Sequence, residues 1–287
     1  MWSLNLRKMA KWSLKDKVVL ITGATGGLGR LLAPELVNKG CKLILFDLDE
    51  GTVEAMAAEF GGNAVGYAAD VRDFDQLTVA TKQGAEHFGH IDIVIAGAGI
   101  AVLYPALEQS EDTFERVIDI NLTGVWRTFA AAFPYIKESQ GHLVTISSMA
   151  AFVHLPFQAT YHASKAGNYA MSNSIRLEVE PLGITVGTIH PTFFDSNMMQ
   201  EARQNEGWKI MTKDTTTSGS KHVSVDNVRD RIIKSLEKRE QTVIIPGKLW
   251  PVAMLSPALR RALEWGGMQS TSVRENAYQV LKKNSKL

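Results

Sequence analysis

The most constraining feature of this chain is a series of short, uninterrupted apolar segments rich in β-branched residues, each followed by a longer amphipathic stretch. The segments lack the polar alternation of a half-exposed sheet, which is typical of parallel strands covered on both faces. Strands that alternate with helices predict βαβ units, right-handed crossovers and a Rossmann-type, doubly wound α/β sheet. The expected strands are Val18–Thr22, Leu43–Phe46, Ala64–Tyr67, Ile91–Ala96, His142–Ser147, Thr185–Ile189 and Gln241–Ile245; the expected helices are Gly29–Lys39, Gly51–Phe60, Phe74–Phe88, Ser110–Lys137 and about 224–238.

We interpret the chain as a single domain, because it shows neither an internal repeat nor a linker. Residues 16–268 form the expected domain, preceded by an N-terminal extension (1–15) and followed by a C-terminal tail (269–287). A loop as long as 193–222 is usually functional or disordered in a compact domain, and we expect it to be a lid over a binding site. The apolar stretch 246–268 predicts a helical extension with a core-facing stripe; an interfacial or dimer face is the alternative.

Composition excludes some function classes. The formal net charge of +1 gives no reason to expect a nucleic-acid partner. The only cysteine, Cys41, forbids an internal disulfide and begins an apolar run, so we expect a small core residue. No apolar run reaches the ~18 residues of a membrane span, although Trp2, Leu4 and Leu6 leave peripheral membrane contact open. We expect a cytoplasmic protein without a bound metal, since no His, Asp or Glu pair has zinc-site spacing.

The first expected strand runs through the sequence TGATGGLG (Thr22–Gly29) directly into a helix. Glycines at such a turn let backbone N–H groups approach a pyrophosphate, whose charge is stabilised by a helix N-terminus. The spacing of Gly23, Gly27 and Gly29 is Gly-x-x-x-Gly-x-Gly, and the alternative is a plain tight turn. The position of the turn, between a buried strand and a helix, favours a dinucleotide site.

Asp47 ends the second strand, 18 residues after Gly29 (47 − 29). A carboxylate about 20 residues past the glycines is placed to accept hydrogen bonds from the adenine-side ribose diol, and it repels the 2′-phosphate of NADP. No Arg or Lys occupies 24–28 or position 48, where a phosphate clamp would be expected. The sequence therefore favours NAD over NADP, unless Asp47 merely ends a strand.

Tyr161 and Lys165 lie four residues apart, on one face of an expected helix. A phenol with a pKa of about 10 needs roughly 4 kcal/mol of extra phenolate stabilisation to exchange protons near neutral pH. A nearby ammonium in a dry site supplies this kind of stabilisation. Ser148 follows the preceding strand, at the carboxyl edge where α/β proteins bind ligands.

From Lys17 to Ile245 the chain resembles the short-chain dehydrogenase/reductase family. The matching pieces are TGATGGLG, Asp70-Val71 after the third strand, AGAG at 96–99, Asn121 in NLTG, Ser148, YHASK at 161–165, and Pro191. The resemblance implies an oxidoreductase that transfers a hydride between a nicotinamide cofactor and an alcohol/carbonyl pair. It also implies a homodimer or homotetramer assembled through the helices Ser110–Lys137 and Tyr161–Glu180.

Catalytic roles are implied by the resemblance for four residues. Tyr161 would be the acid/base, Ser148 would hold the substrate oxygen, and Lys165 would lower the phenol pKa and bind the nicotinamide ribose. Asn121 would anchor a water that links Lys165 to solvent. The expected cofactor contacts are Gly23, Thr25, Gly26, Gly27, Leu28, Gly29, Asp47, Leu48, Asp70, Val71, Gly97, Ala98, Gly99, Tyr161, Lys165, Pro191, Thr192 and Phe194.

Three departures from the family pattern involve four positions. Ala96 and Gly97 stand where asparagines are common, Thr192 replaces a glycine, and Ser196 stands where a threonine often bonds the carboxamide. The last two put the carboxamide contacts in doubt, and none removes the catalytic residues.

Aromatic and methionine residues cluster near the expected site: Phe152, Val153, Leu155 and Phe157 between Ser148 and Tyr161, and Phe193, Phe194, Met198, Met199, Trp208, Ile210 and Met211 after Pro191. Such surfaces favour a lipophilic secondary alcohol or ketone (steroid-like, terpenoid, aromatic or fatty-chain). The alternatives are an NADP-dependent 3-oxoacyl ketoreductase, a non-catalytic dinucleotide-binding protein, and a methyltransferase on a similar fold. For His162 a solvated or packed histidine is favoured over a substrate-facing one.

Overall fold

The computed structural model describes residues 11–195, 199, 200, 204, 223–255 and 282. The expected N-terminal extension up to residue 10, most of the expected lid, the second half of the apolar stretch and nearly all of the tail therefore lie outside the described residues. So do Ser196, Met198, Trp208, Ile210 and Met211.

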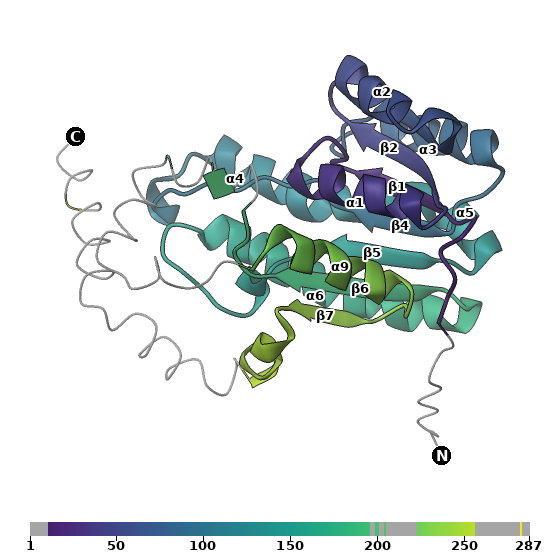
Figure 1. Cartoon of the computed structure of the whole chain (residues 1–287). Coiled ribbons are helices and arrows are strands. Elements are labelled where there is room, and N and C mark those ends of the chain that lie inside the picture. The colour runs from purple at the N-terminus through teal and green to yellow at the C-terminus, as the bar shows by residue number, and fades with distance from the viewer. Residues whose placement is uncertain (1–10, 196–198, 201–203, 205–222, 256–281, 283–287) are drawn as a thin grey trace.

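A parallel sheet of seven strands forms the centre of the molecule, in the order β3-β2-β1-β4-β5-β6-β7 (Figure 1). This arrangement is the doubly wound α/β fold predicted from the sequence. The strand bounds lie within about two residues of the expected ones, and they are β1 Val18–Thr22, β2 Lys42–Asp47, β3 Ala64–Ala68, β4 Ile93–Ala96, β5 His142–Ile146, β6 Thr185–Pro191 and β7 Thr242–Ile245.

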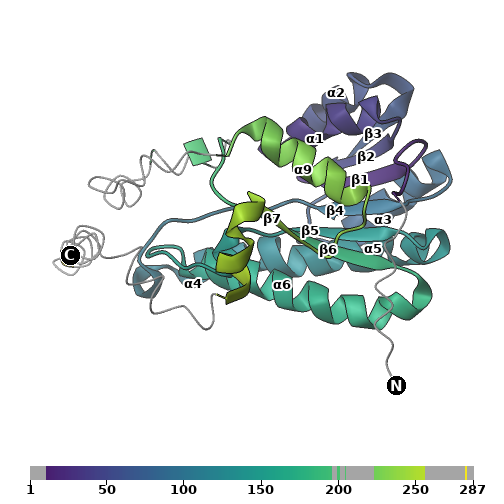
Figure 2. The same ribbon diagram turned by 60° about the horizontal axis from the view of Figure 1, so that its bottom comes forward.

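Helices cover both faces of the sheet (Figure 2). The first face carries α1 Gly27–Asn38, α2 Glu50–Ala58 and α9 Val225–Leu236. The second face carries α3 Phe74–Phe88, α5 Gly124–Ser139 and α6 Ala159–Val179, with α4 Glu111–Ile118 packed against α6. Short 3-10 turns occur at Gly61–Asn63, Ala106–Glu108, Met149–Ala151, Glu180–Leu182 and Gly247–Leu249.

The stretch expected as one helix, Ser110–Lys137, is divided in the structure. Ser110 is the N-cap of α4, and its hydroxyl accepts a hydrogen bond from the N–H of Thr113 at 3.3 Å. A π-helical turn, Asp119–Thr123, then joins α4 to α5. Such a turn is rare within α-helices and is frequent at functional sites. Asn121 lies in this turn and is completely buried.

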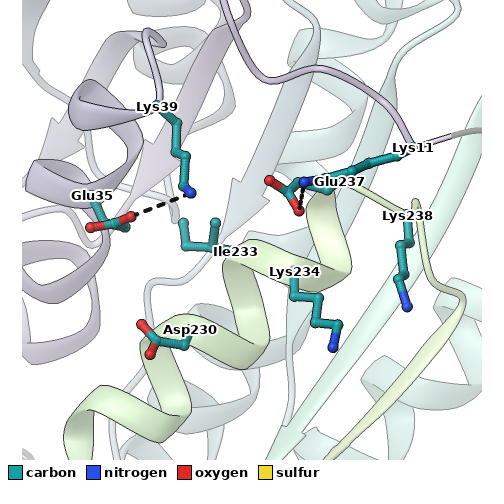
Figure 3. A pocket seen from close by; sticks show the side chains of 8 residues that line it. All are labelled: Lys11, Glu35, Lys39, Asp230, Ile233, Lys234, Glu237 and Lys238. Carbon is teal, nitrogen blue, oxygen red and sulfur yellow. Dashed lines mark ion pairs between the residues drawn. The ribbon is translucent and has the colours of Figure 1, made fainter.

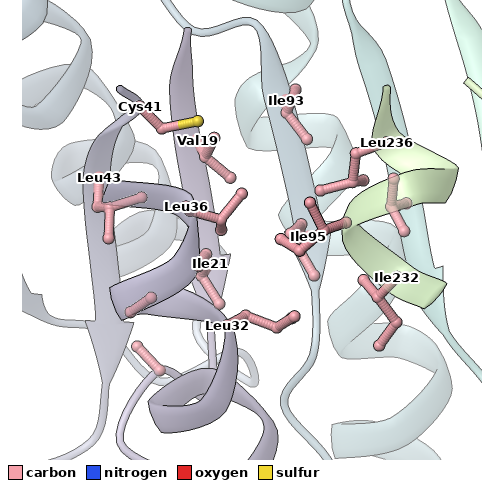
Figure 4. Close-up of a cluster of buried hydrophobic side chains, with 14 of the residues drawn as sticks. Val19, Ile21, Leu32, Leu36, Cys41, Leu43, Ile93, Ile95, Ile232 and Leu236 are labelled. Atoms are coloured by element: carbon pink, nitrogen blue, oxygen red, sulfur yellow. The ribbon is translucent and has the colours of Figure 1, made fainter. Parts of the chain in front are cut away.

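The core on the first face consists of aliphatic side chains from α1 and α9 packed on β1, β2 and β4 (Figure 4). Leu36 of α1 and Leu236 of α9 lie over Val19, Ile21 and Ile95, all with almost no exposed surface. Burial of this kind stabilises a fold by roughly 25 cal/mol for each Å² of apolar surface removed from water. The packing of α1 and α9 on the sheet therefore holds its strands in fixed positions.

Cys41 belongs to the same core, as expected from its apolar run (Figure 4). It is 1% exposed, and burial raises the pKa of its thiol to about 12. A thiol in this environment is neutral and inert at physiological pH.

Two segments outside the sheet also pack on the body. Leu14 is buried, and the guanidinium of Arg239 lies 3.6 Å from the ring centroid of Trp12, so residues 12–14 of the expected extension are held against the domain. Leu249 and Met254, from the apolar stretch, pack on a small cluster around Met149. Trp250 and Leu255 in the same stretch are about half exposed.

Within the described part of the chain, no helix combines the length and the apolar character that crossing a membrane requires.

Candidate active site

The carboxyl ends of the parallel strands meet at one edge of the sheet, and all of the expected site residues that follow a strand lie there. β1 leads into the glycine turn, β2 ends at Asp47, β4 leads into 97–99, and β5 leads to Ser148. Ligands of open α/β sheets bind outside this edge, where the strand order reverses. Here the reversal falls between β1 and β4.

The glycine turn is tightly packed against the chain segment that follows β4. Gly23 has φ +69°, and a Cβ atom added to it would lie 2.8 Å from the Cα of Ala98. A Cβ on Gly29 would lie only 2.2 Å from the carbonyl oxygen of Ala24. The hydroxyl of Thr22 accepts hydrogen bonds from the N–H groups of Gly97 (3.1 Å) and Ala98 (3.4 Å), which fixes the two turns to each other.

The N-terminus of α1 has no side-chain cap. Gly26 is its N-cap, and no acidic residue occupies its first turn, whereas α2, α3, α4 and α9 are capped by the side chains of Asp49, Asp73, Ser110 and Ser224. The first N–H groups of a helix need partners, and an uncapped, glycine-lined N-terminus with its positive dipole end fits a pyrophosphate. The residues present therefore fit a dinucleotide cofactor.

Asp47 is bonded to the glycine turn. Its Oδ2 atom accepts from the backbone N–H (2.8 Å) and the hydroxyl (2.7 Å) of Thr25, and its Oδ1 atom accepts from the N–H of Leu48 at 2.9 Å. A carboxylate has about four acceptor positions, so it retains capacity for a ribose hydroxyl. Leu28, within the turn, packs on the core of the first face.

Asp70 follows β3 and is held by its neighbour Arg72. The guanidinium donates to the carboxylate at 2.9 Å (Nε) and 2.6 Å (Nη2), and this contact lowers the pKa of Asp70. Val71 is buried, and its carbonyl accepts a weak hydrogen bond from Arg127 at 3.4 Å. This pair forms the side of the site next to α3 and α5.

Ser148 and Tyr161 are brought together by β5 and α6. The Ser148 hydroxyl is hydrogen-bonded to the phenol, which lowers the pKa of Tyr161, but burial outweighs this effect and raises it overall. The lowering expected from the Lys165 ammonium stays a prediction. The same hydroxyl accepts from the N–H of Ala150 at 3.1 Å and lies 3.4 Å from the carbonyl oxygen of Pro191.

Lys165 lies beneath Tyr161 on the same helix. Its Nζ is 5.5 Å from the centroid of the Tyr161 ring and donates a hydrogen bond to the carbonyl of Ile146 at 2.9 Å. Burial lowers the pKa of Lys165 to about 8, so the side chain is mostly an ammonium at pH 7. The hydroxyl of Ser147 donates to the backbone carbonyl of Lys165 at 3.0 Å and ties the strand to the helix.

Asn121 supports the site through the loop that follows β4. Its amide exchanges two hydrogen bonds of 2.8 Å with the backbone of Ile100 and donates to the hydroxyl of Ser164 at 3.2 Å. Its backbone carbonyl accepts from the side chain of Asn168 at 2.7 Å. A Cβ on Gly99 would lie 3.3 Å from the Asn121 amide oxygen and 3.6 Å from Nζ of Lys165, so Gly99 keeps this corner open. The water-holding role of Asn121 stays a prediction.

The end of β6 forms the base of the expected lid. The N–H of Thr192 donates to the carbonyl of Ile245 at 2.8 Å, which extends the pairing of Pro191 with β7. Phe194 pairs with Val223 in an isolated bridge, and the N–H of Val223 donates to Phe193 at 3.2 Å. The chain therefore leaves and re-enters the described body at neighbouring points.

Two histidines that the sequence did not single out as site residues bind the loop after Ser148. His190, from β6, lies 3.1 Å (Nδ1) from the backbone oxygen of Ser148, and burial lowers its pKa to about 4. His162, from α6, bonds that loop with both ring nitrogens. The only sequence feature that could have indicated a role for these histidines is that they are adjacent to Pro191 and Tyr161.

A hollow at the surface of the described residues is not part of this site. It measures about 340 Å³ and lies between α1, α9 and Lys11, where Lys39 and Glu35 face Asp230, Lys234 and Glu237 (Figure 3). Lys39 is at the opposite end of α1 from the glycine turn, which places this hollow at the other edge of the sheet. Ion pairs Lys11–Glu237 (3.1 Å) and Lys39–Glu35 (3.8 Å) partly neutralise its charges.

No group of three or more His, Cys, Asp or Glu side chains suited to a metal ion occurs in the described ranges.

A glycine turn that fits a pyrophosphate lies at the same sheet edge as a phenol, a serine hydroxyl and a buried ammonium, and this arrangement fits the class of nicotinamide-dependent oxidoreductases. A family model described as short chain dehydrogenase matches residues 17–207. The chain therefore belongs to the short-chain dehydrogenase/reductase family, whose enzymes act on CH–OH groups with NAD(P).

Individual relatives agree with this assignment. Dehydrogenase/reductase SDR family member 7B of Bos taurus is 29% identical over 94% of this chain and 87% of its own length. An uncharacterized NAD-dependent oxidoreductase of Mycobacterium tuberculosis (strain CDC 1551 / Oshkosh) is 33% identical over 66% of this chain and 75% of its own length. A gluconate 5-dehydrogenase from Burkholderia cenocepacia J2315, solved in complex with NADP and tartrate, has the same fold (TM-score 0.73, 22% identity, 82% of this chain and 95% of that one).

Proposed function

We propose that this enzyme transfers a hydride between NAD(H) and a lipophilic secondary alcohol or ketone, with Tyr161 as the acid/base. The observation that carries the proposal is the hydrogen bond between Ser148 and Tyr161 beside the buried Lys165, at the sheet edge that holds the open glycine turn. A nicotinamide bound in this site would supply the hydride acceptor or donor.

The protein's own groups handle the proton and the substrate oxygen. In oxidation, Tyr161 takes the hydroxyl proton of the alcohol, and Ser148 donates a hydrogen bond to the same oxygen as it becomes a carbonyl. Lys165, charged at pH 7, stabilises negative charge on the phenol oxygen. In reduction the proton moves the other way.

The apolar substrate class is supported by the wall next to Ser148. Phe152 and Val153 pack with Leu249, Val252 and Met254 around the buried Met149. A wall of aliphatic, aromatic and thioether groups binds a bulky apolar ligand better than a polyol, which would lose hydrogen bonds to water there. The test compares turnover of apolar secondary alcohols with sugars and polyols, followed by nicotinamide absorbance, in wild type and Tyr161→Phe. Turnover of polyols alone would refute the substrate class, and an undiminished Tyr161→Phe would refute the acid/base assignment.

The NAD preference rests on Asp47. Its carboxylate lies on Thr25 of the glycine turn, and a 2′-phosphate placed there would meet a negative charge. We expect Asp47→Ser to weaken NAD binding about tenfold, since it removes about 1.4 kcal/mol or more of polar contact, and to improve NADP binding. Calorimetric titration of both cofactors measures this, with Asp49→Ser, an acidic helix cap on the same loop, as the control. Equal NAD and NADP affinities in the wild type would contradict the preference.

We also propose a cytoplasmic homodimer or homotetramer. Support for assembly comes from exposed aromatic side chains on α5: Trp126 is 49% exposed and stacks on Phe74, and Phe133 is 36% exposed. Exposed aromatic groups on one long helix are typical of a subunit interface. Light scattering of wild type against Trp126→Glu tests it, and a monomeric wild type would refute it.

A further inference from the structure

The loop between Ser148 and Tyr161 controls two parts of the proposed site at once. It begins at the serine itself, passes through the 3-10 turn Met149–Ala151, and carries Phe152 and Val153 of the apolar wall. A shift of this loop would move both the group that holds the substrate oxygen and the surface that holds the substrate body. Its anchoring therefore bears directly on catalysis.

His162 fastens this loop to the catalytic helix with both ring nitrogens. Nε2 accepts a hydrogen bond from the backbone N–H of Leu155 at 2.9 Å, and Nδ1 lies 2.8 Å from the backbone oxygen of Ala150. An N–H group only donates and a carbonyl only accepts, so Nε2 must carry the lone pair and Nδ1 the proton. The two contacts thus select one neutral tautomer of the ring.

The surroundings of His162 support the neutral form. The residue is 6% exposed, and burial is the main cause that lowers its pKa, assisted by the neighbouring His154. The rings of His154 and Tyr161 meet it at centroid distances of 5.2 Å and 6.5 Å. Since both nitrogens are occupied by backbone groups, the ring has no free polar atom to offer a substrate.

We propose that His162 is a positioning residue: as the neutral Nδ1–H tautomer, it clips the Ala150–Leu155 segment to the helix that carries Tyr161 and so aligns Ser148 and the apolar wall. His190 holds the other end of the same loop, at the backbone oxygen of Ser148. The inference rests on the proposed catalytic roles of Ser148 and Tyr161.

The first test is independent of turnover. Nitrogen-15 NMR of the histidine side chains in wild-type protein reports which ring nitrogen is protonated. The expected result is a neutral His162 with the proton on Nδ1. A proton on Nε2, or a doubly protonated ring near pH 7, would overturn the inference.

The second test separates positioning from folding. His162→Leu removes both contacts, whereas His162→Gln keeps one donor and one acceptor on a side chain of similar reach. We expect His162→Leu to raise KM for a bulky alcohol about tenfold with NAD affinity unchanged, and His162→Gln to recover most of that loss. His87→Leu, which removes an exposed imidazole from the last turn of α3, is the matched control and should change KM less than about twofold.

Each outcome bears on the inference. Equal impairment of the Gln and Leu variants, or an unchanged KM in a folded His162→Leu, would refute it. If His162→Leu does not fold, the KM of the Gln variant and the tautomer measurement still test whether His162 positions the loop. A wild type that oxidises no alcohol would instead refute the proposed function, and it would leave the tautomer result standing.

Discussion

Lys165→Met is the substitution that most directly probes the electrostatics of the proposed site. Methionine has a similar length and volume but no charge. In the wild type the ammonium lies 5.5 Å from the centroid of the Tyr161 ring, and Lys165 is only 5% exposed. Removing it should destabilise any state in which the phenol oxygen carries negative charge.

The magnitude follows from Coulomb's law. Two unit charges at the 5.5 Å that separates Nζ from the ring centroid interact by about 3 kcal/mol at an effective dielectric constant of about 20. That energy corresponds to roughly a hundredfold in rate. The effect requires a charged lysine, and burial lowers the pKa of Lys165 to about 8. The wild-type advantage should therefore be complete below pH 8 and disappear as the pH rises through this value.

The assay is kcat/KM for alcohol oxidation from about pH 6 to about pH 10, at saturating NAD, because Lys165 also faces the expected ribose site. Lys82→Met, which removes an exposed ammonium paired with Glu86, controls for the change in net charge. Thermal unfolding of each variant checks for the lost hydrogen bond to Ile146. A wild-type to variant ratio that stays constant across this range, or one below about fivefold near pH 7, would refute the electrostatic reasoning.

Two further predictions concern the turn and the buried histidines. Gly29→Ala should abolish measurable NAD binding and cost about 1–3 kcal/mol of stability, because the added Cβ would lie 2.2 Å from a backbone oxygen. Gly51→Ala is the control in the calorimetric titration, because its Cβ would have only one atom nearby, at 3.9 Å. An unchanged NAD affinity of Gly29→Ala would contradict the prediction. His142 and His190 have folded pKa values of about 3 and about 4, below the ordinary 6.5, so the unfolded chain binds their protons more readily. Stability should be full above about pH 6.5 and fall by on the order of 3–5 kcal/mol per histidine towards pH 3–4, as urea unfolding measures; a flat profile in that window would exclude it.

The fold was largely predictable because its elements are determined by local patterns. β1 and α3 occupy the residues expected of them, Val18–Thr22 and Phe74–Phe88, since each is bounded by a clear signal: a glycine after the strand and an aspartate cap before the helix. The π-helical turn at Asp119–Thr123 was not predictable, because the amphipathic pattern continues through it.

The site was predictable only in part. The spacing of Tyr161 and Lys165 on one helix face follows from helix geometry, and their closeness in the structure agrees with it. The contacts of His162 with Ala150 and Leu155 depend on the path of an irregular loop, and no sequence period describes that path. The effect of burial on the pKa of Tyr161 could not be predicted either, because burial depends on the assembled fold rather than on the neighbour in sequence.

The packing of Leu249, Val252 and Met254 on the loop after Ser148 has an evolutionary consequence. The proposed reacting groups reside in the first two thirds of the polypeptide, whereas part of the proposed substrate-binding wall comes from its last quarter. If the proposed function holds, we expect mutations in that late segment to change which alcohol is accepted and to leave hydride and proton transfer intact. Such a division would let substrate preference evolve through substitutions that lie far along the chain from the reacting residues.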